Sequence, residues 1–350
     1  MIAVIYGTRP EIIKLSPLIR LAKAKKLDLV TVYTGQHFSP NMKEVFFDNL
    51  SLPEPDYTLD VGSKSHAVMV AEAMIGIEKI LIKINPDIVL VQGDTNSALA
   101  GALVAAKLGI KVGHIEAGLR SFDRRMPEEL NRIMIDHLSD LLFAPTNIAA
   151  DYLLKEGIQK ENIFVVGNTI ADALTYALKK VGSPDLPLSL NPKEYFLATL
   201  HRQENVDDHL ILQDFIALFQ SISSRYHQRI ILPMHPRTLT LIKKFALNTA
   251  GLDVIDPQDY FSFLNLLNNA RLVLTDSGGI QEESCILGIP CLTLRDNTER
   301  PETLNIQSNI LVGHDQDKAM QAVDYFEKER PVWVSPYGDG KTAERILSVL

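Results

Sequence analysis

The sequence predicts an α/β protein made of two Rossmann-like, doubly wound parallel-sheet domains that face a cleft. Its 350 residues exceed what one ordinary hydrophobic core holds. Short apolar runs alternate with helix-like segments, which is the order of βα units, and after a proline-containing stretch at 179–195 the alternation restarts. We therefore expect an N-terminal domain, 1–168, to which a C-terminal helix of about 338–350 returns, and a second domain, 169–337.

The first half contains a series of apolar runs of strand length, separated by helix-like segments such as 97–108 and 147–156. Because this alternation buries both faces of a sheet, it predicts parallel strands covered by helices. The expected strands are 2–7 (IAVIYG), 29–35 (LVTVYTG), 87–94 (DIVLVQGD), 111–118 (KVGHIEAG), 141–146 (LLFAPT) and 163–168 (IFVVGN).

The second half repeats the pattern without obvious sequence identity to the first. Ligands of such sheets bind outside the carboxyl ends of the strands, so we expect the functional side chains there. The expected strands are 196–201 (FLATLH), 230–235 (IILPMH), 252–256 (LDVID), 272–279 (LVLTDSGG), 290–294 (PCLTL) and 309–313 (NILVG).

The composition excludes several classes of protein. A net charge of -8 and a pI near 5.6 argue against a nucleic-acid or membrane-surface binder, which carries a basic excess. No apolar run approaches the roughly 18 residues of a membrane span, and the first residues lack the features of a signal peptide. The only cysteines, Cys285 and Cys291, show neither zinc-ligand nor disulfide spacing. We expect a soluble cytoplasmic protein that binds no metal.

The stretch 272–288 (LVLTDSGGIQEESCILG) predicts a phosphate site in the second half. Ser277, Gly278 and Gly279 lie between a buried strand and a helix, where small residues let a diphosphate approach backbone amides at the positive helix terminus. Glu283 in the first turn either complements the helix dipole or accepts hydrogen bonds from ribose hydroxyls. Ser-Gly-Gly is also a common turn.

The first half lacks the GxGxxG fingerprint after its opening strand, which disfavours a nicotinamide-dependent dehydrogenase. In its place, YGTRPEIIKLSP puts Arg9 in the loop and Lys14 one turn into the helix. Both either solvate the helix start or hold an anion. Two cations at a helix N-terminus oppose its dipole, so a bound anion would account for them.

The stretch 114–132 (HIEAGLRSFDRRMPEELNR) contains four carboxylates and four arginines. Glu116 follows a strand, and Pro127 begins a helix on which Glu128 and Arg132 share a face at i,i+4. Glu128 and Arg132 form either an ordinary ion pair or part of an active site.

Further polar residues close other strands. Asp94 follows 87–93, where capping of the next helix is its commonest role. His201 and His235 each close a strand of the second half, so both should reach the cleft. A lone histidine is usually structural, but two at equivalent strand ends favour a functional role. Arg300, in LRDNTERPETL, adds charge after another strand, although exposed loop charge explains it equally.

Taken together, these motifs resemble those of the UDP-N-acetylglucosamine 2-epimerase family, nearly from end to end. The residues that carry the resemblance are GTRPEIIKLSPL, TGQH, VQGDTNSALAGALVAA, HIEAGLRS, MPEELNR, DHLSDLLFAPT, GNTIADAL, TDSGGIQEE, TERPETL and SPYGDGKTAERI.

The resemblance implies a glycosyltransferase-B-like fold, often as a homodimer, in an enzyme of cell-surface polysaccharide biosynthesis. It also implies inversion at C2 of UDP-N-acetylglucosamine to give UDP-N-acetylmannosamine, through elimination and re-addition of UDP. No cofactor takes part in such a reaction.

Site residues follow from the resemblance motif by motif. Those resembling the family's catalytic groups are Asp94, Glu116, Glu128, Arg132 and His201. Those resembling its substrate-binding groups are Arg9, Lys14, Gln36, His37, His235, Ser277, Gly278, Gly279, Glu283 and Arg300.

Two stretches depart from the pattern of many bacterial members, LHRQENVDD at 200–208 and PMHPRT at 233–238. The first also resembles enzymes that act on diacetamido uronic-acid nucleotides. Four alternative functions remain. They are a 2-epimerase of such a nucleotide, a hydrolysing 2-epimerase that releases UDP and N-acetylmannosamine, a glycosyltransferase, and a non-catalytic nucleotide-sugar sensor.

Overall fold

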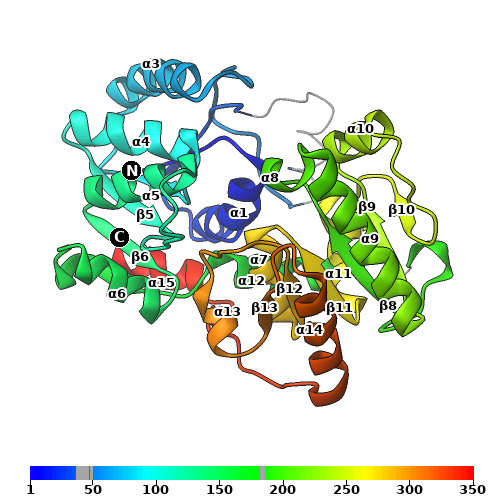
Figure 1. Cartoon of the computed structure of the whole chain (residues 1–350). Helices are drawn as coiled ribbons and strands as arrows, with labels where there is room; N and C mark the ends of the chain where they lie inside the picture. The colour runs from blue at the N-terminus through cyan, green and yellow to red at the C-terminus, as the bar shows by residue number, and fades with distance from the viewer. Residues whose placement is uncertain (37–46, 48–49, 182–185) are drawn as a thin grey trace. The chain divides into compact units, whose positions relative to one another are not determined.

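The computed structural model describes residues 1–36, 47, 50–181 and 186–350. The chain divides into two compact units, one of residues 1–175 and 336–350 and one of residues 176–335 (Figure 1). The chain passes between them twice, within helix α7 (Thr169–Val181) and between Ser335 and Pro336.

The first unit is built on a seven-stranded, all-parallel sheet in the order β3-β2-β1-β4-β5-β6-β7. The short outer strand β3 was not expected from the sequence. The strands are β1 (Ile2–Tyr6), β2 (Leu29–Tyr33), β3 (Tyr57–Thr58), β4 (Ile88–Gln92), β5 (Lys111–Ile115), β6 (Leu141–Ala144) and β7 (Ile163–Val165).

Helices follow the strands of this unit and bury their apolar faces. Helices α3, α4 and α5 pack side by side, and α15 packs against α1. The return of a C-terminal helix to the first unit is therefore observed. Besides the start of α7, the helices are α1 (Arg9–Ala24), α3 (His66–Ile84), α4 (Asn96–Lys107), α5 (Pro127–Leu138), α6 (Asn147–Lys155), the 3-10 turn η1 (Lys160–Asn162) and α15 (Thr342–Val349).

The second unit has a six-stranded, all-parallel sheet in the order β10-β9-β8-β11-β12-β13. Its strands are β8 (Tyr195–Thr199), β9 (Arg229–Pro233), β10 (Asp253–Ile255), β11 (Leu272–Thr275), β12 (Cys291–Thr293) and β13 (Asn309–Leu311). Its helices are η2 (Pro187–Ser189), α8 (Gln203–Val206), α9 (His209–Tyr226), α10 (Pro236–Lys244), α11 (Tyr260–Asn269), α12 (Gly278–Leu287), α13 (Pro301–Asn305) and α14 (Gln316–Glu329).

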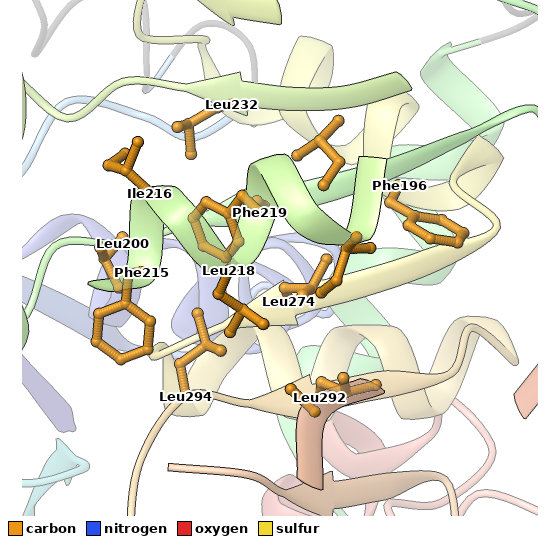
Figure 2. Close-up of a cluster of buried hydrophobic side chains, with 14 of the residues drawn as sticks. Phe196, Leu200, Phe215, Ile216, Leu218, Phe219, Leu232, Leu274, Leu292 and Leu294 are labelled. Atoms are coloured by element: carbon orange, nitrogen blue, oxygen red, sulfur yellow. The ribbon is translucent and has the colours of Figure 1, made fainter. Parts of the chain in front are cut away.

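The core of the second unit lies between α9 and its sheet (Figure 2). Phe215 and Phe219 of α9 are buried in one cluster with Phe196, Leu274 and Leu292 from three strands. Burying each such side chain stabilises the fold by roughly 1.5–3 kcal/mol. This packing holds α9 on the sheet and leaves the strand ends to carry polar residues.

Both sheets are parallel throughout, so the prediction of two Rossmann-like parallel-sheet domains is confirmed. In a parallel sheet all carboxyl ends lie at the same edge. The central strands β1, β4 and β5 therefore present the residues that follow them at one edge of the first unit, and β8, β9 and β11 do so in the second. Within the described part of the chain, no helix is long and apolar enough to cross a membrane.

Candidate active site

Glu116 directly follows β5 and is the centre of a buried polar cluster in the first unit. One carboxylate oxygen, Oε1, pairs with the Lys14 ammonium and lies 3.2 Å from the Asn168 amide nitrogen that donates to it. The other oxygen, Oε2, accepts a hydrogen bond from the Gln92 amide. Lys14 is buried as well, so its charge is compensated by Glu116 within the protein.

The backbone of Glu116 is held in a left-handed conformation, with φ of 74°. This region costs a residue with a side chain on the order of 1–3 kcal/mol, and such strain clusters at functional sites. The chain is fixed there because the Glu116 amide donates to the Phe143 carbonyl at 3.1 Å. Gly93 lies at the end of the neighbouring strand. A Cβ atom added to this glycine would be 3.5 Å from Glu116 Oε2, so the two strand ends are close.

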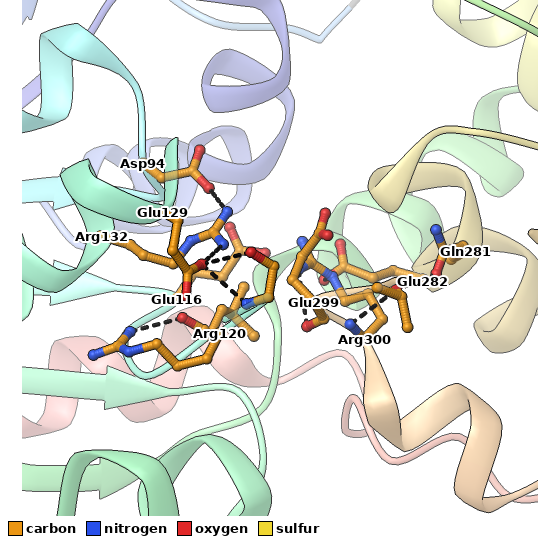
Figure 3. A network of polar contacts seen from close by, with 12 residues as sticks. Asp94, Glu116, Arg120, Glu129, Arg132, Gln281, Glu282, Glu299 and Arg300 are labelled. Carbon is orange, nitrogen blue, oxygen red and sulfur yellow. Dashed lines mark hydrogen bonds and ion pairs between the residues drawn. The ribbon is translucent and has the colours of Figure 1, made fainter. Parts of the chain in front are cut away.

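Arg132 connects two carboxylates at the same sheet edge. One guanidinium nitrogen pairs with Asp94 after β4, and the other pairs with Glu129 on α5 (Figure 3). Of the two interpretations of Glu128 and Arg132, the ordinary ion pair is not observed among the described residues: Arg132 is buried and pairs with Asp94 and Glu129, whereas Glu128 is exposed.

The capping role considered for Asp94 is also wrong. Helix α4 is capped by Thr95, whose hydroxyl accepts from the Ala98 amide at 3.0 Å. The Asp94 carboxylate is thereby left to pair with Arg132, and its carbonyl oxygen accepts from the Asn131 amide at 2.9 Å. Asp94 therefore belongs to the polar cluster and not to the helix cap.

Glu129 is a site residue that the sequence reasoning missed. It is buried, and it accepts hydrogen bonds from the Ser121 hydroxyl and amide and from the Phe122 amide, each at 2.9 Å. It thus ties the loop before α5 to Arg132. Nothing in the local sequence distinguishes it from Glu128, since only the direction of α5 decides which glutamate faces inward.

The loop after β1 carries Arg9 and is fixed by Glu11. The Glu11 carboxylate accepts from the Thr8 amide and hydroxyl at 2.8 Å and from the Thr95 hydroxyl at 2.9 Å. Burial raises the pKa of Glu11 to about 7, although these donors oppose the shift. Arg9 is exposed at the first position of α1, and Lys14 is buried a turn later.

Gln36 is buried and its side-chain oxygen accepts from the Ser97 hydroxyl at 2.9 Å and the Ser97 amide at 3.2 Å. This contact joins the end of the β2 loop to the first turn of α4. His37 lies outside the described residues.

Other charges of the 114–132 stretch hold the fold together. His114 Nε2 donates to the Gly93 carbonyl at 2.8 Å, and Nδ1 lies 2.6 Å from Asp136. Arg120 pairs with Asp136 at 2.7 Å and with Glu156 at 2.6 Å. Burial would raise the pKa of Asp136, but His114 and Arg120 outweigh it and the pKa is lowered. The charge of this stretch therefore serves both the site and the scaffold.

The second unit has its own polar cluster around Asp276, which follows β11. This buried carboxylate accepts from the amides of His201 at 2.9 Å and Arg202 at 2.8 Å, and its other oxygen lies 2.9 Å from His201 Nδ1. Burial opposes these contacts, yet the pKa of Asp276 is lowered. Asp276, to which the sequence assigned a place at this strand end but no role, orients His201.

His235 lies beside His201, with ring centroids 6.1 Å apart, as their equivalent strand ends suggested. It is the N-cap of α10, where its Nδ1 accepts from the Arg237 amide at 3.3 Å. Burial and the neighbouring His201 and Arg237 lower the pKa of His235. The imidazole of His235 is therefore neutral over a wider pH range than usual.

Helix α12 begins directly after Ser277, and the Ser277 side chain makes no capping hydrogen bond. Gly279 has space around it, since an added Cβ atom would be 3.9 Å from its nearest neighbour, Ser277 Oγ. At Gly278 the same atom would be 2.3 Å from Glu299 Oε1. The two glycines thus serve different needs, close packing at Gly278 and open backbone at Gly279.

Arg295, Glu299 and Arg300, which follow β12, are buried, so the interpretation of Arg300 as exposed loop charge is wrong. Arg300 pairs with Glu282 of α12 (Figure 3). Arg295 pairs with Glu299 at 2.9 Å. Glu283 is also buried. Burial raises the pKa of the Tyr260 hydroxyl, and the nearby Glu283 carboxylate adds to this effect.

The chain has two Rossmann-like parallel sheets, and each carries charged residues at the carboxyl ends of its strands. This architecture is that of an α/β enzyme of the glycosyltransferase-B-like class. A family model described as UDP-N-acetylglucosamine 2-epimerase matches residues 19–350. The chain belongs to this family, which confirms the resemblance seen in its motifs, and it is an epimerase.

Individual relatives match along the whole chain. A UDP-N-acetylglucosamine 2-epimerase from Methanococcus maripaludis is 50% identical over 360 residues, covering 100% of this chain and 98% of the relative. A UDP-2,3-diacetamido-2,3-dideoxy-D-glucuronate 2-epimerase from Pseudomonas aeruginosa is 41% identical over 354 residues, covering 100% and 99%. The crystal structure of the Methanocaldococcus jannaschii UDP-GlcNAc 2-epimerase in complex with UDP-GlcNAc and UDP matches at 49% identity, with a TM-score of 0.93, covering 99% of this chain and 98% of that chain.

Proposed function

We propose that this protein interconverts UDP-N-acetylglucosamine and UDP-N-acetylmannosamine by inverting C2, without net hydrolysis. The observation that carries the proposal is its similarity over the whole chain to an enzyme whose crystal structure contains UDP-GlcNAc and UDP. The relative that acts on a diacetamido glucuronate nucleotide is less similar, at 41% against 50% identity.

The reaction needs a base for the C2 proton and positive charge for the departing diphosphate. A carboxylate removes the C2 proton, a C1=C2 double bond forms, and the bond from C1 to the UDP oxygen breaks with its electron pair leaving on UDP. A proton then reaches C2 from the opposite face, and the UDP oxygen bonds to C1 again. Atoms and charge balance without water or a cofactor.

Residues of the first unit carry the proton transfers in this proposal. The catalytic carboxylates are Asp94, Glu116 and Glu128, and Arg132, which contacts Asp94, sets the charge around them. Arg9, Lys14 and the loop of Gln36 and His37 contribute to substrate binding. The ion pair of Lys14 with Glu116 supports this assignment, because it joins a proposed substrate-binding residue and a candidate catalytic carboxylate in one buried cluster.

Residues of the second unit hold the nucleotide. Ser277, Gly278 and Gly279 bind the diphosphate at the start of α12, whose amides the Ser277 side chain does not cap. His201 acts on the diphosphate as it leaves, since Asp276 holds its other ring nitrogen. The remaining substrate-binding groups are His235 near the phosphates, Glu283 at the ribose and Arg300.

Proton NMR of UDP-N-acetylglucosamine with the enzyme in heavy water tests this function. We expect loss of the C2 proton signal and a stable mixture of the two UDP-sugars, both deuterated at C2. Accumulation of free N-acetylmannosamine would instead indicate a hydrolysing enzyme. Exchange with a UDP-diacetamido uronic acid alone would indicate the other substrate, and binding without exchange would indicate a sensor.

The protein is further proposed to act as a homodimer in the cytoplasm. An apolar groove on the first unit supports the dimer, and it is lined by His66, Ala67, Val70, Ala71 and Met74 of α3, Asn96 of α4, and Pro127, Leu130, Asn131 and Met134 of α5.

Two free, buried thiols support a reducing compartment. An activated N-acetylmannosamine is a building block for glycans, which supports a place in cell-surface polysaccharide biosynthesis.

A further inference from the structure

Asn168 lies between β7 and α7, and its side chain is bonded at both ends. Its amide nitrogen donates to Glu116 Oε1 at 3.2 Å. Its amide oxygen accepts from the Ile170 backbone amide at 3.0 Å and so caps the first turn of α7. The side chain is buried, and these two bonds fix the orientation of its amide.

The backbone of Asn168 is held by the segment that returns to the first unit at the end of the chain. Its amide donates to the Tyr337 carbonyl at 2.8 Å, and its carbonyl accepts from the Thr342 hydroxyl at 3.2 Å. Asp172 of α7 accepts from the Thr342 and Ala343 amides at 3.1 and 3.0 Å, which caps α15. Asn168 is thus bonded to both segments through which the chain passes between the units.

Two of the three donors to Glu116, Lys14 and Asn168, differ in the conformational freedom of their side chains. Lys14 supplies charge through a long side chain with many rotamers, whereas Asn168 is short and is fixed at its other polar atoms. A donor whose own orientation is fixed also fixes the orientation of the carboxylate that accepts from it. A group that transfers protons needs such a fixed orientation toward its substrate.

We propose that Asn168 is a positioning residue that orients the Glu116 carboxylate, and that the returning segment around Tyr337 and Thr342 holds Asn168 in place for this purpose. The inference rests on the proposed role of Glu116 in proton transfer. It assigns the C-terminal segment a part in catalysis, although its residues lie far from Glu116 in sequence.

The test compares Asn168→Ser and Asn168→Asp with the wild-type enzyme. Both variants keep an oxygen that caps α7 at Ile170. The serine side chain is too short for its hydroxyl to reach Glu116, and the aspartate oxygen that replaces the amide nitrogen accepts and does not donate. We expect kcat to fall by about 10- to 100-fold, as for loss of a group that acts on the transition state, while KM and the Kd for UDP stay within about threefold. Thr342→Val, which removes the hydroxyl that holds Asn168, lowers kcat by about threefold.

The matched control is Thr175→Val on the same helix. The Thr175 hydroxyl donates within α7, to the Ala171 carbonyl at 2.8 Å, so its removal leaves kcat unchanged. Wild-type kcat in both Asn168 variants would overturn the inference. So would equal losses in kcat, UDP affinity and melting temperature, because these indicate a structural role alone.

A double-mutant cycle separates this inference from the proposed function. Asn168→Ser and Glu116→Gln are combined, and the urea midpoint of each variant is measured without substrate. We expect the two shifts to be non-additive, since the side chains are in contact. Additive shifts contradict the inference even in a protein without turnover, whereas a wild-type enzyme that exchanges no C2 proton contradicts only the proposed function.

Discussion

Two neighbouring residues, Glu128 and Glu129, have opposite environments in the first turn of α5. Glu128 is exposed, and within the described part of the chain the structure records no ion pair for it. Glu129 is buried, pairs with Arg132 and accepts three hydrogen bonds from the preceding loop. The contrast separates a residue available to a substrate from one that holds the site in shape.

Substitution of each glutamate tests this contrast. Glu128→Gln is expected to lower kcat by about 100-fold or more, as for a lost acid or base, with no change in melting temperature. Glu129→Gln removes one of the two carboxylates that pair with the buried Arg132 guanidinium, and it is expected to lower the free energy of unfolding by ~3 kcal/mol. Turnover by NMR and calorimetric melting distinguish the two. Near-normal turnover of Glu128→Gln would remove this residue from the catalytic set.

The sequence was informative about which residues matter and less so about what they contact. Glu116 was singled out because it follows a strand, yet its partners come from positions 102, 24 and 52 residues away. Only Lys14 among these was predicted to belong to the site. Gln92 and Asn168 were missed because an amide next to a strand end carries no pattern of its own until the sheet order is known.

At the level of elements, the start of α12 shows how a local sequence is divided between packing and binding. Both glycines of Ser277-Gly278-Gly279 were predicted to let a diphosphate approach the backbone. In the structure Gly278 is packed against Glu299, whereas the position at Gly279 is open. The glycine pattern was visible in the sequence, but the reason for each glycine depends on the Glu299 side chain from another loop.

Alanine at each glycine gives a matched pair of variants. Gly278→Ala forces its Cβ atom against Glu299 and is expected to destabilise the second unit by ~1–3 kcal/mol. Gly279→Ala gains helix propensity, so its melting temperature stays the same or rises. Its new methyl group obstructs the diphosphate, and the Kd for UDP rises about tenfold, which equals ~1.4 kcal/mol.

Calorimetry of unfolding and titration calorimetry with UDP check both expectations. If Gly279→Ala binds UDP as tightly as the wild-type protein, the diphosphate does not approach α12 at this residue. If Gly278→Ala is as stable as the wild type, Glu299 is able to move aside.

For the whole molecule, the alternation of strands and helices was enough to predict two parallel-sheet units, because each βα unit leaves a long and regular pattern. The two-residue strand β3 and the short helices α8 and α13 were not predicted, since elements of that length show no periodicity. The return of the C-terminal helix to the first unit was expected from the sequence, but its packing partner α1 was not, because the local sequence does not show which helix it meets.

The proposed reaction uses side-chain cations and helix amides to hold the diphosphate, so its rate does not depend on a divalent metal. We expect the same kcat in EDTA, at about 5 mM and so in large excess over any metal that is purified with the protein, as in added magnesium. The same C2 exchange assay provides the measurement. Loss of activity in EDTA with recovery on adding magnesium would contradict this part of the proposal.

The apolar groove of the first unit leads to a prediction about the assembly. Met134 of α5 is 44% exposed, and it lines this groove together with apolar side chains of α3, so the exposed apolar surface there is contiguous, as at a surface that a partner covers. Asn131, which also lines the groove, donates to the Asp94 carbonyl, so the groove adjoins the proposed catalytic cluster.

A charge at Met134 is therefore expected to separate the subunits and to lower turnover as well. Leu154 on α6 is a matched control, because it is 43% exposed, belongs to the same unit and does not line the groove. Light scattering after size exclusion should give twice the 39.0 kDa chain mass for the wild type and for Leu154→Glu, and the single mass for Met134→Glu.

A wild-type protein of 39.0 kDa, or a Met134→Glu variant that stays dimeric, would show that the groove does not hold a second copy. Because burial of an apolar groove drives association and a buried carboxylate opposes it, the difference between the two variants identifies the interface.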